Sequence, residues 1–317
     1  MSPLIEVKNL KKHFKVKAGN LHAVDDISFS INKGKTLGLV GESGCGKSTT
    51  GRVILKLTPA TGGDVFFGEE NILGFNKKQT LAFRESAQFV FQDPFASLNP
   101  RLSVSEIIAE PLIIYKKSVN KNDLRSKVLE LMDTVGLAER YENVYPHELD
   151  GGRRQRIGIA RALALNPSFI VLDEPVSALD VSIQAQILNL LQDLQESFHL
   201  TYLFISHDLG VIKHMSDHIA VMYLGKIVEM SDYKTLFEYS RHPYTKALLS
   251  AIPIPDVDIK RERIILEGDV PSPINPQPGC RFYGRCFEKM DICKDNDPEM
   301  VEVSAGHFVA CHKHLGK

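Results

Sequence analysis

The glycine-rich segment GESGCGKST at residues 41–49 contains the residue types that hold a phosphate chain. Glycines such as Gly41 and Gly46 leave room for backbone N–H groups to close around phosphate oxygens. Lys47 can reach the terminal phosphates, and the Ser48 hydroxyl can bind Mg²⁺. We interpret Cys45 as a small residue that fills space in the loop, not as a nucleophile. The residues expected to contact a nucleotide are Gly41, Ser43, Gly44, Cys45, Gly46, Lys47, Ser48 and Thr49.

Two acidic residues, Asp173 and Glu174, end the segment FIVLDE at residues 169–174. Its apolar run is typical of a buried strand in a parallel sheet. Asp173 is suited to hold Mg²⁺ directly or through water, and Glu174 to act as a general base or to orient an attacking water. A solvated strand end is the alternative, but the phosphate loop upstream favours the catalytic interpretation.

Two further strand ends carry polar side chains. The segment YLFISHDL places His207 just past a strand that we expect to end at Ser206, and FVFQDP at residues 89–94 places Gln92 at another strand end. Carboxyl ends of parallel strands face the crevice where α/β proteins bind ligands. We therefore predict that His207 and Gln92 act in catalysis, Gln92 as a ligand of Mg²⁺ or water. A helix N-terminal histidine and an ordinary surface amide are the alternatives.

Strands and helices that alternate along the chain must position these residues. The run TLGLV at residues 36–40 predicts a strand before the phosphate loop, and a helical pattern follows the loop. In the polar stretch at residues 121–137, four apolar residues recur at helical spacing: Leu124, Val128, Leu131 and Val135. Core packing explains that stripe as well as binding of a partner does. The pattern as a whole predicts an α/β fold.

Composition limits the class of protein. The 317 residues, enough for about two average domains, are 43% hydrophobic and 24% charged, with a net charge of −1. A charge this close to zero argues against nucleic acid as the partner. No apolar run is long enough to span a membrane, and the N-terminus lacks the apolar core of a signal peptide. We therefore expect a cytosolic chain, in which thiols stay reduced.

The order of these motifs resembles that of the ATP-binding subunits of ABC transporters, over about residues 5–235. By position, residues 41–49 match the Walker A loop, residues 169–173 Walker B and residues 177–180 the D-loop. The segment HELDGGRRQR at residues 147–156 matches the signature motif, which is usually LSGGQ. The resemblance implies a P-loop cassette with a RecA-like α/β core, an antiparallel β part and an inserted helical subdomain.

The same resemblance implies roles for single residues. Glu174 matches the catalytic glutamate, Gln92 the Q-loop and His207 the switch histidine of the family. Phe14 falls where the family carries an aromatic residue that stacks on adenine, although a core-packing aromatic near the first strand is the alternative. We expect the nucleotide-binding domain to cover residues 1–252.

In that family ATP lies between two cassettes, with the Walker motifs of one facing the signature of the other. The resemblance therefore implies a heterodimer with a paralogous ATP-binding subunit. It also implies a peripheral position at the cytoplasmic face of the membrane, on two permease subunits that work with an extracellular substrate-binding protein. The helical subdomain, expected at about residues 93–165, contacts the permeases.

The last part of the chain, residues 253–317, differs from the cassette. Six of the sixteen prolines lie between Pro253 and Pro278, which predicts a linker. The segment RHPYTKALLSAIP at residues 241–253 and the cysteines beyond it resemble the C-terminal extension of oligopeptide and dipeptide importer ATPases, in the F-type subunit. The nickel-importing branch shares much of this tail.

Four of the five cysteines, Cys280, Cys286, Cys293 and Cys311, lie in this extension. A small module with few apolar residues needs cross-links to fold. Disulfides are disfavoured in a reducing cytosol, while a zinc site and an iron–sulfur cluster both use four thiolates. The spacing does not decide between the two metals, but the family resemblance implies a [4Fe-4S] cluster. Three nearby histidines, which we expect at the surface, are His307, His312 and His314.

Asp150 stands where the signature motif has a serine that donates a hydrogen bond to the γ-phosphate on the opposite cassette. An ionised carboxylate cannot donate, and at about 4 Å it would repel a phosphate charge by roughly 4 kcal/mol at an effective dielectric near 20. Asp150, Gly151 and Gly152 are still expected to face that nucleotide. Aspartate is also a good helix N-cap, and Arg153 can pair with it. We expect one competent ATP site and one weakened site.

The sequence therefore predicts an ATP-hydrolysing subunit that energises import of dipeptides or oligopeptides. An ATPase of a nickel or oligosaccharide importer is the alternative within the subfamily. A soluble signature-bearing ATPase of DNA repair, chromosome structure or translation usually carries two cassettes or a long coiled coil, and this sequence shows neither. A non-hydrolysing regulatory module is disfavoured by the presence of Glu174 and His207.

Overall fold

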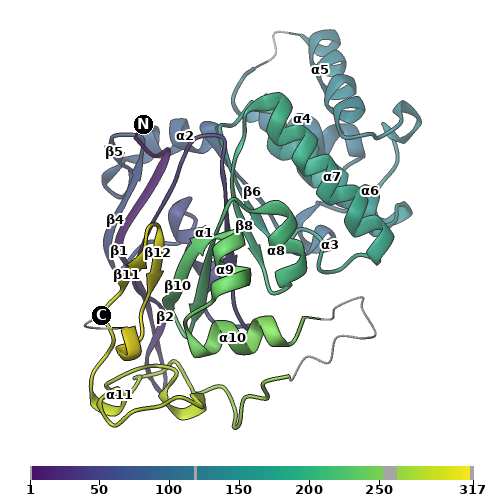
Figure 1. Cartoon of the computed structure of the whole chain (residues 1–317). Helices are drawn as coiled ribbons and strands as arrows, with labels where there is room; N and C mark the ends of the chain where they lie inside the picture. Colours follow the sequence, from purple (N-terminus) through teal and green to yellow (C-terminus); the bar gives the residue numbers. More distant parts are fainter. Residues whose placement is uncertain (1, 118–119, 253–262, 315–317) are drawn as a thin grey trace. The chain divides into compact units, whose positions relative to one another are not determined.

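The computed structural model describes residues 2–117, 120–252 and 263–314 (Figure 1). The contacts between residues divide the chain into two units. The first comprises the described parts of residues 1–31, 36–73 and 206–317, and the second residues 32–35 and the described parts of 74–205. The first ten residues of the predicted linker, 253–262, lie outside the described residues.

An antiparallel sheet forms one part of the first unit. Its long strands alternate in burial, so that Ile5, Val7 and Leu10 of the first strand and Ile27 and Phe29 of the second lie in the core. The sheet has the order β2-β1-β4-β5. Its strands are β1 (Ile5–Val16), β2 (Gly19–Ile31), β4 (Gly62–Phe67) and β5 (Glu70–Asn71).

The other strands of the first unit follow the order β3-β9-β10-β12-β11. Buried apolar runs form β3 and β9, which pair in parallel, as expected for strands covered on both faces. The C-terminal strand β12 pairs with β10, beside which it lies in Figure 1. The strands are β3 (Thr36–Val40), β9 (His218–Tyr223), β10 (Lys226–Asp232), β11 (Val301–Ser304) and β12 (His307–Val309).

Two helices of the first unit, α9 and α10, begin at polar side-chain caps. Asp232 accepts the backbone N–H of Thr235 at the start of α9, and His242 accepts that of Tyr244 at the start of α10. Pro243 occupies the first turn of α10, where proline is tolerated. The helices are α1 (Lys47–Ile54), α8 (Leu209–Met215), α9 (Tyr233–Tyr239), α10 (Pro243–Ser250) and α11 (Ile292–Asp295).

The second unit contains three parallel strands and a helical part. Strand β7 (Phe169–Asp173) is entirely buried and pairs with β6 (Ala87–Val90) and β8 (Thr201–Ser206). Between β6 and β7, a capping box of Ser103 and Glu106 starts one helix. Val128 and Met132 face the core from another. The helices are α2 (Lys77–Ser86), α3 (Pro94–Ser97), α4 (Val104–Ile114), α5 (Lys121–Thr134), α6 (Gly151–Leu163) and α7 (Val181–Phe198).

The strands predicted before the phosphate loop, at residues 169–173 and up to Ser206 are confirmed. The strand predicted to end at Gln92 ends at Val90, because the chain turns toward Pro94, which starts α3. In the described part of the chain, no helix combines the length and apolar character that crossing a membrane requires.

Candidate functional site

The predicted phosphate loop joins the buried strand β3 to helix α1. Gly46 has a left-handed φ of 109°, and a Cβ there would lie 2.0 Å from the Ala23 carbonyl oxygen. At Gly41 a Cβ would lie 2.1 Å from the Met222 carbonyl oxygen. Only glycine fits at these two positions, since backbone of neighbouring strands occupies the space. The loop is therefore held closely against β2 and against the end of β9.

Lys47 directs its ammonium group back into the loop. Its Nζ donates to the carbonyl oxygens of Gly41 at 2.7 Å and Glu42 at 3.0 Å, and the side chain is 5% exposed. These bonds place a buried positive charge inside the ring of loop residues. The ammonium group is therefore positioned for phosphate oxygens that enter the loop.

Cys45 points into the interior of the loop region and is buried. Burial raises the pKa of its thiol, although the charge of Lys47 opposes this effect. A thiol that stays protonated is a poor nucleophile. The structure thus favours the interpretation of Cys45 as a space-filling residue.

The second unit brings Gln92 and Glu174 together. The Nε2 of Gln92 donates to Oε2 of Glu174 at 2.9 Å, and Asp173, which precedes the glutamate, is 1% exposed. Glu174 has a left-handed backbone with a φ of 47°, and its N–H donates to the Ile205 carbonyl oxygen at 2.9 Å. Such a conformation in a residue other than glycine costs roughly 1–3 kcal/mol and is common at functional sites.

His207 follows the last residue of β8 and is exposed. The turn around it is well ordered by hydrogen bonds, because Asp208 donates its N–H to Ser206 Oγ at 3.0 Å and accepts that of Gly210 at 2.7 Å. The imidazole is therefore displayed at the carboxyl end of a parallel strand, as the sequence predicts.

Phe14 lies near the end of β1 in the first unit, with its ring half-buried. The ammonium group of Lys12 lies 4.5 Å from the centre of this ring. An aromatic ring that keeps part of its surface open can stack on a base, and the adenine contact stays a prediction.

Asp150 caps helix α6. Its Oδ1 accepts the backbone N–H of Arg153 at 2.8 Å, and its Oδ2 pairs with the guanidinium group of the same residue. The carboxylate remains 53% exposed. The predicted cap and the predicted Asp150–Arg153 pair are therefore both present, while Gly151 and Gly152 form the first turn of the helix.

The four C-terminal cysteines are free thiols and lie near one another. The N–H of Cys280 donates to the Cys293 carbonyl oxygen at 2.9 Å. Burial raises the pKa of the Cys280 thiol to about 12, and nearby Cys293, Cys286 and Cys311 add to this. Within the described residues, no three of the four sulfur atoms lie within 4.8 Å of one another.

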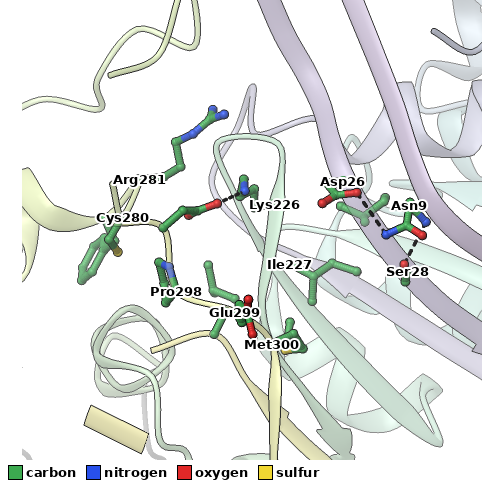
Figure 2. Close-up of a pocket in the computed structure, with 15 residues that line it drawn as sticks. Asn9, Asp26, Ser28, Lys226, Ile227, Cys280, Arg281, Pro298, Glu299 and Met300 are labelled. Atoms are coloured by element: carbon green, nitrogen blue, oxygen red, sulfur yellow. Dashed lines mark hydrogen bonds and ion pairs between the residues drawn. The ribbon is translucent and has the colours of Figure 1, made fainter. Parts of the chain in front are cut away.

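Backbone N–H groups point at three of the four sulfurs. Phe282 donates to Cys280, Glu288 to Cys286 and Lys313 to Cys311. Burial raises the pKa of all three thiols, and each of these bonds only partly opposes that rise. Cys280 also borders a pocket of about 310 Å³, between the C-terminal loop at Pro298 and strands β1, β2 and β10 (Figure 2).

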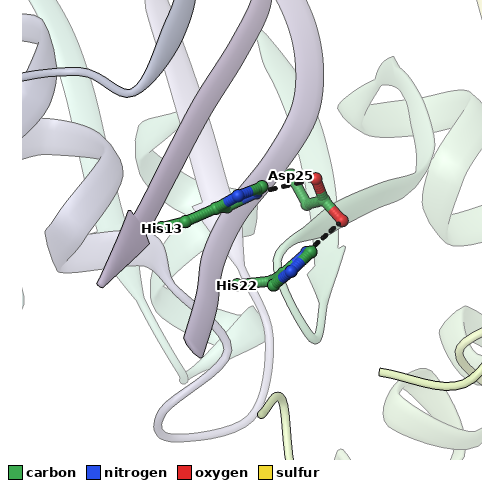
Figure 3. Close-up of side chains that lie close together, drawn as sticks. All are labelled: His13, His22 and Asp25. Atoms are coloured by element: carbon green, nitrogen blue, oxygen red, sulfur yellow. Dashed lines mark hydrogen bonds and ion pairs between the residues drawn. The ribbon is translucent and has the colours of Figure 1, made fainter. Parts of the chain in front are cut away.

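Two histidines and an aspartate form a cluster on β1 and β2 that no sequence motif predicts. His13 Nε2 and His22 Nδ1 each lie 3.0 Å from an oxygen of Asp25, and the rings stack at 3.8 Å (Figure 3). Arg281 pairs with the same carboxylate. Burial raises the pKa of Asp25, but the two histidines and Arg281 outweigh this and bring it to about 2. The guanidinium group supplies the cation, so we describe the cluster as an ion-pair network.

The expectation that His307 lies at the surface is wrong. Its side chain is 1% exposed, and its Nε2 lies 2.8 Å from Oε1 of the fully buried Glu229. The same carboxylate accepts the N–H groups of Arg241 and His242. A buried carboxylate needs such partners, and β12 supplies one of them. His312 and His314 are half-buried.

Glu42, an unspecified position of the phosphate loop pattern, is also held from the C-terminal part. Its carboxylate pairs with Arg285, and its N–H donates to the Tyr244 hydroxyl oxygen at 2.9 Å. No local sequence pattern could reveal these contacts, because more than 200 residues separate the partners along the chain.

Family models match two parts of the chain. The ABC transporter model matches residues 24–177, and the model of the oligopeptide/dipeptide transporter C-terminal region matches residues 228–293. Among solved structures, the dimeric MJ0796, a bacterial ABC transporter cassette, is 31% identical with a TM-score of 0.67. This similarity covers 72% of this chain and 98% of that one. The similarity supports the predicted cassette fold.

Curated relatives match nearly the whole chain. The oligopeptide transport ATP-binding protein OppF of Bacillus subtilis is 53% identical, over 97% of this chain and 96% of the relative. AppF of the same organism is 50% identical, over 98% and 97%. The dipeptide transport ATP-binding protein DppF of Haemophilus influenzae is 46% identical, over 98% and 96%. Since these similarities extend along almost the full length of both chains, the chain belongs to the ATP-binding subunits of the oligopeptide/dipeptide ABC transporter family.

Proposed function

We propose that this chain hydrolyses ATP to drive import of dipeptides or oligopeptides across the cytoplasmic membrane. The main support for ATP hydrolysis is Glu174 at the end of β7. Its backbone is left-handed and its carboxylate accepts a hydrogen bond from Gln92. Membership of the family supports ATP hydrolysis coupled to transport, and the names of OppF, AppF and DppF support peptides as the substrate class.

Each residue of the site has a distinct role. Lys47 binds the terminal phosphates, while Ser48 and Asp173 would hold Mg²⁺, which would supply positive charge near the transferred phosphoryl group. Glu174 orients or deprotonates the attacking water. Gln92 fixes the carboxylate of Glu174 and contacts Mg²⁺ or water, and His207 contacts the γ-phosphate.

A second set of contacts completes the nucleotide site. Phe14 stacks on adenine, and backbone N–H groups of the loop surround the phosphates. The loop residues that contact the nucleotide are Gly41, Ser43, Gly44, Cys45, Gly46 and Thr49. Asp150, Gly151 and Gly152 face the nucleotide held by a paralogous ATP-binding subunit, with which the chain forms a heterodimer.

The chain acts on two permease subunits at the cytoplasmic face of the membrane. An extracellular substrate-binding protein delivers the substrate to these permeases. A pocket of about 540 Å³ between α4 and α5 supports this proposal. Ile113 and Ile114, which line it, are 59% and 60% exposed, and the charged residues Arg125 and Glu142 also line it. An exposed apolar patch with a charged rim is typical of a protein interface, and we assign it to a cytosolic helix of a permease.

Residues 1–252 form the nucleotide-binding domain, with a helical subdomain at about 93–165, and residues 253–317 the linker and the four-cysteine module. We assign a [4Fe-4S] cluster to that module, held by Cys280, Cys286, Cys293 and Cys311. Four free thiols near one another and the N–H groups directed at three of them suit thiolate ligands of iron. The cluster would cross-link a module that has little apolar core.

Reconstitution tests the proposed function. The chain, its paralogue and two permeases are placed in liposomes, and ATP hydrolysis is measured with the binding protein loaded with a peptide, with nickel or with an oligosaccharide. Stimulation by peptide alone, and its loss in Glu174→Gln, is the expected result. Stimulation by nickel or oligosaccharide instead would overturn the substrate class, and full activity of Glu174→Gln would overturn the mechanism.

A further inference from the structure

Glu42 places a negative charge inside a loop that must bind phosphates. It is the second residue of the glycine-rich loop, and its carboxylate is 27% exposed. Like charges close together at low dielectric repel strongly. The loop can therefore bind an anion well only if this carboxylate is neutralised or turned away.

The C-terminal module supplies the neutralising charge. Arg285 donates from Nη1 to Oε2 of Glu42 at 2.8 Å and from Nη2 to Oε1 at 3.2 Å. The arginine side chain is only 10% exposed. A two-bond guanidinium–carboxylate pair is geometrically specific and is stronger than a single ionic contact.

The backbone of Glu42 is fixed as well. Its N–H donates to the hydroxyl oxygen of Tyr244 on α10 at 2.9 Å, and its carbonyl oxygen accepts from Lys47 at 3.0 Å. Burial raises the pKa of Tyr244, so the phenol stays protonated and neutral. Side chain, N–H and carbonyl of one loop residue thus each have a separate partner.

Aromatic packing connects these partners. The ring of Tyr244 lies 4.7 Å from that of Tyr223 on β9 and 5.4 Å from that of Phe282, three residues before Arg285. Phe282 is 1% exposed. Because the interior is closely packed, the position of Arg285 is fixed relative to the loop.

We propose that Arg285 is a positioning residue for the glycine-rich loop: by pairing with Glu42 it neutralises the carboxylate and holds the loop open to the phosphates of ATP. The C-terminal extension therefore contributes to nucleotide affinity. The inference rests on the proposal that the loop binds ATP, but not on which metal the cysteines hold.

The test is a set of variants of the full chain, assembled with its paralogue, in which binding of Mg·ATP and the KM and kcat of hydrolysis are measured. Arg285→Ala leaves the Glu42 carboxylate unpaired and should raise the Kd and KM for ATP roughly five- to tenfold, with a smaller change in kcat. Arg285→Lys keeps a charge but loses the two-bond geometry, so an intermediate value is expected.

Removal of the carboxylate distinguishes positioning from a structural role. Glu42→Gln combined with Arg285→Ala should bind ATP more tightly than Arg285→Ala alone, because the repulsive charge is gone. If Arg285 had only a structural role, the losses of ATP affinity in the two single variants would instead add up in the double variant. Failure of the double variant to recover any affinity would overturn the proposal.

Arg281→Ala is the matched control. Arg281 lies in the same module and pairs with the carboxylate of Asp25, which is outside the loop. This variant should lose stability, measured by thermal unfolding, without the increase in Kd for ATP. Equal increases in both variants, or an unchanged Kd in Arg285→Ala, would refute the inference. If the wild-type complex itself bound no ATP, the proposed function would fail instead.

Discussion

Replacing Asp150 by serine tests whether this residue weakens one of two ATP sites. Serine restores the hydrogen-bond donor that the family has at this position and keeps a good helix cap for α6. The change therefore acts on charge and hydrogen bonding at the tip of the helix, with little cost to its stability.

The expected magnitude follows from the exposure of the carboxylate and from its partner. Two unit charges about 4 Å apart repel by roughly 1 kcal/mol in water and by roughly 4 kcal/mol at an effective dielectric of 20. Asp150 is 53% exposed and its charge is partly compensated by Arg153, so the lower value applies. Asp150→Ser should tighten nucleotide binding at the P-loop of the partner about fivefold.

Arg153 provides a second perturbation with the opposite sign. Arg153→Ala removes the guanidinium group that pairs with Asp150 and should weaken binding at the same site. In Asp150→Ser the loss of Arg153 should also weaken binding, because the free guanidinium group attracts phosphate.

The assay is binding of a fluorescent ATP analogue and steady-state hydrolysis by the purified heterodimer. Lys47→Ala in this chain should abolish turnover, since it affects the site that we propose to be the competent one. The equivalent lysine change in the paralogue should leave substantial turnover. Equal losses from the two lysine variants, with no change in nucleotide binding on Asp150→Ser, would show that Asp150 is only a helix cap.

Three other predictions follow from the site. In the proposed mechanism Glu174 acts on water and Lys47 on phosphate. Glu174→Gln should therefore lower hydrolysis by the assembled complex by orders of magnitude while binding of ATP persists, and both can be measured on one preparation. Cys286→Ser should remove iron and sulfide from anaerobically purified protein and destabilise the module more than the nucleotide-binding domain, as metal analysis and hydrogen exchange would show. A fall in pH from 6.5 to 4 should reduce stability in urea unfolding. Burial lowers the pKa of His242 from 6.5 to about 4, so the unfolded chain binds more protons in this range. The contribution of the neutral His242 to the free energy of unfolding is fully present above pH 6.5, and roughly 3 kcal/mol of it is lost by pH 4.

Each of these predictions has its own control. His242→Asn keeps a side chain that caps α10 but does not titrate, so its stability should vary less over the same pH range. If the stability of His242→Asn varied with pH as much as that of the wild type, His242 would not be the group responsible. For the cluster, Cys45→Ser should leave the iron content unaltered, whereas colourless protein with stoichiometric zinc would exclude iron. Near-normal turnover in Glu174→Gln would remove this residue from catalysis.

Local patterns revealed the strands and the phosphate loop, because buried runs such as Phe169–Asp173 and glycines in a loop are dictated by neighbours in sequence. The N-cap role of Asp150 was predictable for the same reason.

Contacts between residues far apart in the sequence were not predictable. Glu42 and Arg285 are two ordinary charged residues whose pairing depends on how the C-terminal module packs, and His307 becomes buried only because β12 joins β10. Periodicity carries no information about such partners.

The pairing of β12 with β10 means that the last strands of the chain finish a sheet begun far earlier in the sequence. During synthesis, one edge of β10 has no partner strand until residues 307–309 have left the ribosome. Until then Glu229 also lacks its histidine partner. Open edges invite pairing with other chains, and loss of a hydrogen-bond partner by a buried polar group costs about 1–3 kcal/mol. A chain shortened to the cassette alone would keep that edge permanently. If such a fragment aggregated, the cause would be the unpaired edge of β10 and not a defect in its ATP site.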